Sequence, residues 1–132
     1  MDHVDRTLQE WRQGRFVYGE SDCMLSIFRY VGLCGLRDVS DRFRGRYSDH
    51  ESALRMLHLH GGVSGAMELT GAVEVDDEPQ RGDVVELFYD NAEAIGSICT
   101  GGMLAARLER GVVEVSMRLV RWRGVWRPSL EA

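Results

Sequence analysis

The stretch that decides the fold is Phe16–Cys23 (FVYGESDC), which runs directly into the apolar segment Met24–Phe28 (MLSIF). Asp22 is suited to be the N-cap of a helix, which places Cys23 at the first helical position. Unpaired backbone amides and the positive end of the helix dipole favour a thiolate at that position. Cys23 is therefore a candidate nucleophile, and a cysteine hydrolase also needs a base.

The composition is that of one folded domain. The 132 residues are 44% hydrophobic and can bury a core, so we expect a single domain over residues 1–132. A net charge of -5 argues against a nucleic-acid-binding module. Residues 1–10 lack the apolar run of a signal peptide, and no later segment reaches membrane-spanning length. We expect synthesis in the cytoplasm and no membrane insertion.

The three cysteines are few and odd in number, which argues against a disulfide framework. Cys23 and Cys34 are eleven residues apart on one predicted helix, roughly 16 Å along its axis, which is too far for a bridge. Cys34 and Cys99 are most simply small buried hydrophobic residues.

The basic residues form a second distinctive pattern. All 16 of them are arginine, which we attribute to a GC-rich genome. Six lie between Arg107 and Arg127, after an acidic segment over residues 68–93. Arginine and tryptophan are favoured at interface hot spots, so this end of the chain is a candidate partner-binding surface, and the alternative is a set of solvated strand faces. The residues concerned are Trp122, Arg123, Trp126 and Arg127.

Two helices are expected in the first quarter of the chain. Apolar residues at three-to-four spacing predict an amphipathic helix over residues 2–13 that ends at Gly14, with Trp11 anchoring it to the core. The apolar positions after Cys23 predict a second helix that stops near Gly35. We expect this second helix to be the central buried one.

A capping box opens the next predicted helix. Ser48 is the expected N-cap and Glu51 occupies the third helical position. The helix is expected to run to Gly61–Gly62, where two glycines stop it.

The pattern changes to short β-type runs from residue 73 onward, separated by Gly, Asn and Asp. Helices first and strands second indicate an α+β domain in which an antiparallel sheet packs on the N-terminal helices. Gly101–Gly102 is read as a hairpin turn. The predicted strands are Val73–Val75, Val84–Tyr89, Ile95–Thr100, Met103–Leu108 and Val112–Val115.

The pattern Phe16-x-Tyr18-Gly19-x-x-Asp22-Cys23 resembles the Tyr-x-Trp-Gly…Asp-Cys signature of NlpC-type cell-wall peptidases. Arg81–Val85 looks like the Gly-Asp-Leu/Val turn that opens the first core strand of that family, and Ala94–Ile98 looks like its following His-Val-Gly-Ile strand. Gly124–Arg127 resembles the closing strand of small phage proteins related to these peptidases, which often sit among tail genes. The resemblance implies a papain-like domain with Cys23 as the nucleophile.

The departure from the family lies at Ala94, where the family carries its general-base histidine. A methyl group cannot accept a proton. The polar residue that orients this histidine in the family would fall near residues 103–106, which are Met, Leu and Ala. The resemblance thus implies a papain-like scaffold that keeps its cysteine without the usual catalytic partners.

The histidines offer one route to a replacement base. His3 lies in the first predicted helix, and His50, His58 and His60 lie in the capped helix. Either His58 or His60 could approach Cys23 through folding, and the alternative is surface or cap-region histidines. His58 and His60 differ by about 200° around a helix and cannot share a metal.

No metal site or cofactor is expected. The chain has no Cys-x-x-Cys or His-Glu-x-x-His spacing and no phosphate-binding glycine loop.

The residues before Cys23 have more than one interpretation. Tyr18 and Phe16 are read either as residues that line a substrate groove or as ordinary core contacts. Asp22 is read as N-cap, as a member of the site, or as both.

These observations predict a tail-tip or tail-assembly component of a phage, prophage or gene transfer agent, with an NlpC-like fold and a degenerate catalytic site. The expected partners are other tail proteins and peptidoglycan, and the expected location is the virion tail after synthesis in the host cytoplasm. The alternative is an active cysteine peptidase or amidase that cleaves peptidoglycan stem peptides during genome delivery, with a relocated base. A third interpretation is a host-side binding or immunity module.

Overall fold

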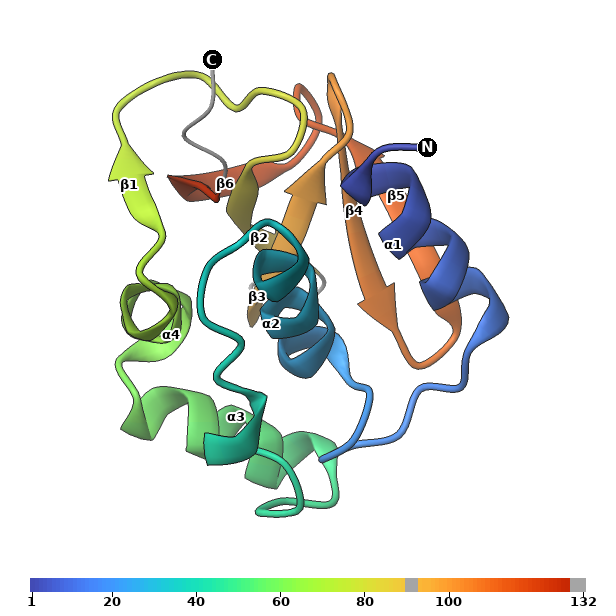
Figure 1. Cartoon of the computed structure of the whole chain (residues 1–132), viewed down its shortest axis with the longest axis vertical. Helices are drawn as coiled ribbons and strands as arrows, with labels where there is room; N and C mark the ends of the chain where they lie inside the picture. The colour runs from blue at the N-terminus through green and yellow to red at the C-terminus, as the bar shows by residue number, and fades with distance from the viewer. Residues whose placement is uncertain (90–92, 129–132) are drawn as a thin grey trace.

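The computed structural model describes residues 1–89 and 93–128 and has helices first and strands second. The helices gather in the first half of the chain, and the strands form one antiparallel sheet with order β1-β6-β2-β3-β4-β5 (Figure 1). The α+β class and the antiparallel sheet packed on N-terminal helices are confirmed. The elements are α1 (His3–Gln13), α2 (Cys23–Leu33), η1 (Ser40–Arg42), α3 (His50–Leu59), α4 (Gly62–Thr70), β1 (Val73–Val75), β2 (Val84–Tyr89), β3 (Glu93–Cys99), β4 (Met103–Leu108), β5 (Gly111–Ser116) and β6 (Arg121–Arg127).

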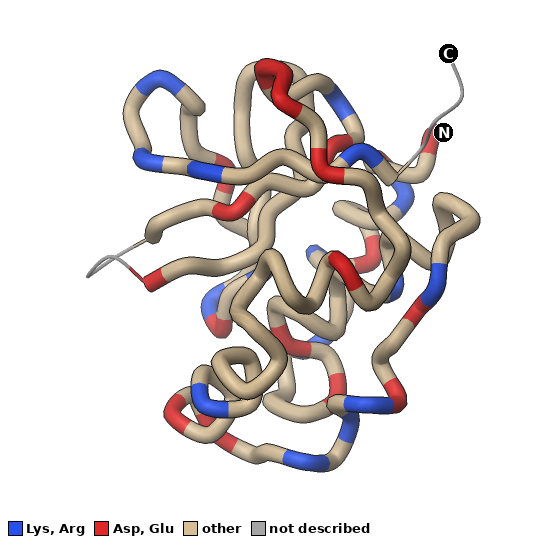
Figure 2. Tube along the Cα trace, turned by 90° about the vertical axis from the view of Figure 1, so that its left-hand side faces the viewer, with Lys and Arg blue, Asp and Glu red and all other residues tan. Residues whose placement is uncertain are grey.

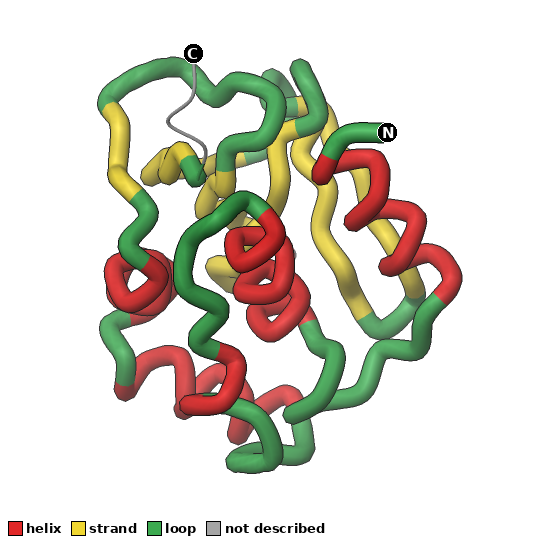
Figure 3. The backbone as a smooth tube through the Cα atoms, viewed as in Figure 1, coloured by secondary structure: helices red, strands yellow, loops and turns green. Residues whose placement is uncertain are grey.

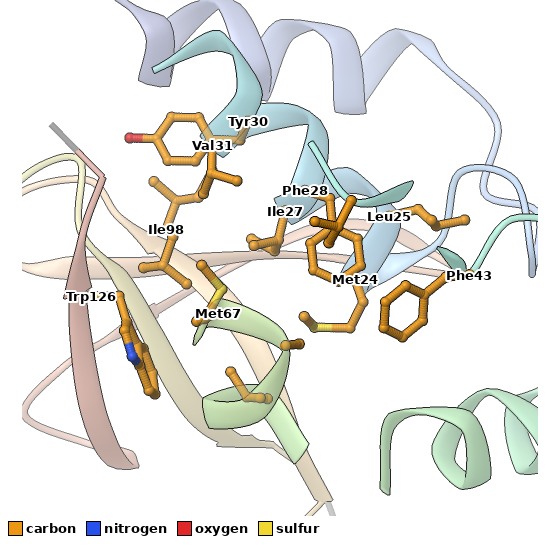
Figure 4. Close-up of a cluster of buried hydrophobic side chains, with 14 of the residues drawn as sticks. Met24, Leu25, Ile27, Phe28, Tyr30, Val31, Phe43, Met67, Ile98 and Trp126 are labelled. Atoms are coloured by element: carbon orange, nitrogen blue, oxygen red, sulfur yellow. The ribbon is translucent and has the colours of Figure 1, made fainter. Parts of the chain in front are cut away.

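Helix α2 is the central buried helix, as predicted. Ile27, Phe28 and Val31 are fully buried on it, and α2 packs against β3 and β4. Figure 4 shows side chains of α2 meeting Met67 of α4 and Ile98 of β3 in one cluster. Helix α1 ends at Gly14 and is anchored by the buried Trp11, which was also predicted.

The sheet has a buried cluster on each face. Alternate residues of a strand point to opposite faces, so Val84 joins the cluster under the helices and Val85 joins a second one. The second cluster includes Leu87, Cys99 and Leu104 and is flanked by side chains from the segment between β5 and β6. Cys99 is buried as expected, and Cys34, the C-cap of α2, is half-buried.

The capping box of α3 lies one residue later than predicted. Asp49, not Ser48, is the N-cap, and its side chain accepts a hydrogen bond from the Ser52 amide. Ser52 therefore takes the third helical position that was assigned to Glu51. The chain offers Ser and Asp in succession, and a carboxylate is as good an N-cap as a hydroxyl.

Helix α4 was not predicted. Gly61–Gly62 ends α3 as expected, and Gly62 then begins a second helix that runs to Thr70 (Figure 3). Val63, Ala66, Met67 and Thr70 are buried at three-to-four spacing, so the periodic signal was present and the glycine pair obscured it.

Candidate functional site

A cavity of about 610 Å³ opens beside the N-terminus of α2. The segment before α2, helix α3, strand β3 and the turn between β4 and β5 all contribute to its walls. Volumes of this size are common for ligand-binding pockets. The predicted site residues Tyr18, Asp22, Cys23 and Ala94 all line it, together with Phe16, Met24, Phe43, Tyr47, His50, Ala53, Leu54, Leu57, Tyr89, Glu93, Ile95, Leu108, Glu109 and Arg110.

Asp22 is the N-cap of α2, as predicted, and is only 3% exposed. One carboxylate oxygen accepts a hydrogen bond from the Leu25 amide at 3.2 Å. The other accepts from the Gly19 amide at 2.8 Å and from the Tyr47 hydroxyl at 2.6 Å. Asp22 thus fixes both the start of α2 and the loop before it, and its acceptor capacity is used by the protein itself.

Cys23 is the first residue of α2, but its environment does not favour a thiolate. Burial raises the pKa of the Cys23 thiol to about 12, and the negative charge of Asp22 acts in the same direction. The thiol donates to the Gly96 carbonyl oxygen at 3.4 Å. Desolvation and the neighbouring carboxylate therefore oppose the thiolate that the helix terminus favours.

Gly96 of strand β3 lies beside the start of α2, and its lack of a side chain allows the close approach of the two elements. A Cβ atom at Gly96 would lie 3.1 Å from Ile27 and 3.3 Å from Met24, so only glycine lets α2 approach the strand this closely without a shift. Ala94 lies two residues earlier on β3 and lines the same cavity. The stretch where the resemblance implies the third catalytic residue is apolar, and its Leu104, Ala105 and Ala106 on β4 are fully buried.

His50 enters the cavity from the N-terminus of α3. Its Nδ1 lies 3.2 Å from the Tyr18 hydroxyl, and its Nε2 lies 3.0 Å from the Glu93 carboxylate. In a neutral ring Nε2 donates to the carboxylate, which leaves Nδ1 to accept from the hydroxyl. Burial raises the pKa of Tyr18 to about 12, and the charge of Glu109 contributes, so the hydroxyl stays protonated at neutral pH.

The other histidines lie elsewhere. His3 and His58 are exposed, whereas His60 packs on Phe43 with ring centroids 4.5 Å apart. Within the described ranges, the hydrogen-bond partner of the Cys23 sulfur is the Gly96 carbonyl and not a histidine nitrogen. His50 therefore reaches the cavity without reaching the thiol.

Arg107 is a structural residue that sequence reasoning placed on a surface. It is only 8% exposed, and its guanidinium donates to the Ser26 hydroxyl at 3.2 Å and to the Arg15 carbonyl at 3.0 Å. Burial lowers its pKa. Arg107 thus ties the loop before Cys23 to strand β4.

The four predicted partner-binding residues do not form one exposed surface. Trp126 is 3% exposed and belongs to the core, and Trp122 is half-buried. Arg127 makes a two-pronged ion pair with the buried Asp83 at 3.0 and 2.9 Å. Arg123 has an exposed side chain, yet it pairs with Glu86 at 2.9 Å. The interface prediction is corrected for Trp126 and Arg127, because their side chains are already engaged inside the protein.

The acidic and arginine-rich segments of the sequence do not form separate acidic and basic regions in the folded protein. Figure 2 shows acidic and basic positions interspersed over the trace. Arginines from β6 and from the β1–β2 loop meet carboxylates far away in sequence, such as Arg81 with Asp2 and Asp5.

The part of the chain that the structure describes, residues 1–89 and 93–128, contains neither a metal-binding cluster nor a membrane-spanning helix. There, no group of three or more His, Cys, Asp or Glu side chains is placed to hold a metal ion. Over the same ranges, none of the helices is long and apolar enough to span a bilayer.

These features define an α+β protein that carries a cysteine at the start of its buried helix, in a cavity shared with a tyrosine, a histidine and a glutamate. The model of one family, described as a domain of unknown function (DUF6950), matches residues 1–127, and the chain belongs to this family. A search of curated proteins gave no match, and neither did a search of solved structures.

Proposed function

We propose that this protein is a tail-tip or tail-assembly component of a phage or gene transfer agent, built on an NlpC-like papain fold whose peptidase site no longer hydrolyses. One observation carries the loss of activity. Cys23 shares its cavity with Ala94 where the peptidases have a base, and its protonated thiol is hydrogen-bonded to the Gly96 carbonyl. A thiol without a base or cation is a poor nucleophile for acyl transfer.

The NlpC-like assignment is supported by the order and packing of the elements. A cysteine begins the buried helix α2, and strands β3 and β4 of the antiparallel sheet pack against it. The Gly82–Asp83 turn leads into β2, and Asp83 accepts a hydrogen bond from the Gln80 amide. These features agree with the motif order seen in the sequence.

The assignment to a tail is supported by the resemblance of Gly124–Arg127 to the closing strand of phage proteins related to these peptidases. In this proposal the protein is made in the host cytoplasm and joins the virion tail, where other tail proteins are its neighbours and peptidoglycan is a possible contact. Genes for tail proteins on both sides of its own gene would agree with this role, and a host immunity locus would contradict it.

A zymogram on peptidoglycan tests the loss of activity. Equal amounts of the wild-type protein and of Cys23→Ala should both leave the gel opaque, because neither has a base beside residue 23. Clearing by the wild type that disappears in Cys23→Ala would contradict the proposal.

Alkylation of Cys23 gives a second readout of the same prediction. Since only the thiolate reacts and its pKa is about 12, the rate with iodoacetamide should still be rising with pH between about pH 6 and about pH 9. Peptide mass spectrometry can follow Cys23 separately from Cys34 and Cys99. A rate that levels off near neutral pH would show an activated thiol instead.

The second candidate function is an active cysteine peptidase or amidase that uses His50. The observation that favours it is the contact of His50 with Glu93 inside the cavity that holds Cys23, since a carboxylate orients many catalytic histidines. Under this alternative the zymogram would clear with wild-type protein and with His58→Gln. It would stay opaque with His50→Gln, whereas exposed His58 on the same helix serves as the matched control.

A further inference from the structure

The cavity beside Cys23 has an excess of negative charge. Three carboxylates line it, from Asp22, Glu93 and Glu109, against one guanidinium, from Arg110. Asp22 is satisfied by three donors of the protein, and Glu93 is engaged by His50. Glu109 lies exposed in the turn between β4 and β5, at the rim of the cavity. It is the carboxylate best placed to meet a cation from outside.

Aromatic rings line the same cavity as these carboxylates. Phe16 and Tyr18 meet edge to face with centroids 5.0 Å apart, and Phe43, Tyr47 and Tyr89 also line the cavity. Ring faces attract cations, and the guanidinium of arginine is the group most often found on them. Aromatic faces next to a carboxylate are therefore a suitable environment for an arginine side chain.

The cavity also has room for more than one side chain. Its volume of about 610 Å³ extends along α3, where Ala53, Leu54 and Leu57 form an apolar wall. Residues on either side of a bound arginine could pack there, which indicates an extended peptide segment and not a free cation.

We propose that this cavity docks an extended segment of a partner protein, with an arginine side chain between the aromatic rings and Glu109 and with flanking apolar residues on α3. This inference rests on the proposed function, because a groove that no longer cuts can hold a segment of a neighbouring protein. Because carboxylates outnumber guanidinium groups in the cavity lining, we expect the bound segment to be basic. All 16 basic residues of this chain are arginine, and a partner encoded by the same genome is expected to share that preference.

The test uses the full-length protein and the peptide acetyl-Ala-Leu-Arg-Leu-Ala-amide, with binding measured by isothermal titration calorimetry. The matched peptide carries citrulline, which has the shape of arginine without its charge, and should bind about tenfold more weakly. Glu109→Gln should weaken the binding of the arginine peptide by a similar factor and leave the affinity for the citrulline peptide unchanged. Glu78→Gln removes one carboxylate from an exposed position outside the cavity and should have no effect.

Three outcomes would overturn the docking proposal. They are equal binding of the arginine and citrulline peptides, no binding of either, and loss of affinity in Glu78→Gln as great as in Glu109→Gln. A pentapeptide with a free N-terminus and citrulline in place of arginine forms a further arm. If it bound as tightly as the arginine peptide, the cavity would recognise a terminal ammonium and the side-chain assignment would be wrong.

The recovered peptide separates this inference from the proposed function. Mass spectrometry after the titration should show the arginine peptide intact. Cleavage that depends on Cys23 would contradict the proposed loss of activity, whatever the affinity. Intact peptide without charge-dependent binding would overturn the docking proposal alone.

Discussion

Trp126→Ala is expected to destabilise the folded protein by about 3–5 kcal/mol, the range for removing a large aromatic side chain from a core. Trp126 is 3% exposed and lies in the cluster that joins β6 to α2 and α4. Its ring also lies over Gly124, where a Cβ atom would come within 2.5 Å of the ring. The motif Gly124–Arg127 is therefore a packing motif, in which the glycine makes room for the tryptophan. Equilibrium unfolding in urea measures the loss.

Trp122→Ala is the matched control on the same strand. Trp122 is half-buried and packs at the edge of the cluster on the opposite face of the sheet, so its removal should cost clearly less. Since a domain is stable by only about 5–15 kcal/mol, Trp126→Ala should also lower the soluble yield. Equal stability of the two variants would contradict the core role of Trp126 and favour the original prediction that it binds a partner.

Strands β1 to β5 could be predicted from the sequence because their information is local, whereas β6 (Arg121–Arg127) was expected only over Gly124–Arg127, from the resemblance to a closing strand. Val84–Tyr89 and Met103–Leu108 have the predicted bounds, and β3 and β5 differ from the prediction by two residues or fewer at each end. Each run is rich in β-forming residues and is bounded by turn residues. Helix α4 could not be predicted in the same way, because the glycine pair that stops α3 also starts α4.

The candidate site was only half predictable for a similar reason. Asp22 and Cys23 are neighbours, and their roles as N-cap and first helical residue follow from their position in the motif. His50 and Glu93 are 43 residues apart, and nothing in their local sequence indicates their contact. The protonation state of Cys23 could not be predicted from the motif, because burial, which opposes the thiolate, depends on the whole fold.

The charged residues show the same limit. The segment over residues 107–127 reads as a basic surface, but Arg127 meets Asp83 and Arg123 meets Glu86 across the sheet. An ion pair between adjacent strands depends on register, which the sequence of one strand does not reveal.

Asp22→Ala is expected to cost at least about 3 kcal/mol, because a buried donor without an acceptor costs about 1–3 kcal/mol and three donors lose theirs. These are the amides of Gly19 and Leu25 and the hydroxyl of Tyr47. The substitution therefore removes the N-cap of α2, a hydrogen bond that holds the loop carrying Tyr18, and the hydrogen bond to Tyr47. Urea unfolding measures it. Asp49→Ala is the control, since it removes the N-cap of α3 at an exposed position and should cost less.

Asp22→Asn separates the charge of this residue from its hydrogen bonds. The amide oxygen can still accept from part of the donor set, so the variant should stay folded at a smaller cost in stability. Because the negative charge of Asp22 raises the pKa of Cys23, its removal should lower that pKa and speed the alkylation of Cys23 at a fixed pH. Folded Asp22→Asn with an unchanged rate would mean that burial alone keeps the thiol protonated. A faster rate would show that the same carboxylate which holds the loop and helix together also suppresses the nucleophile beside it.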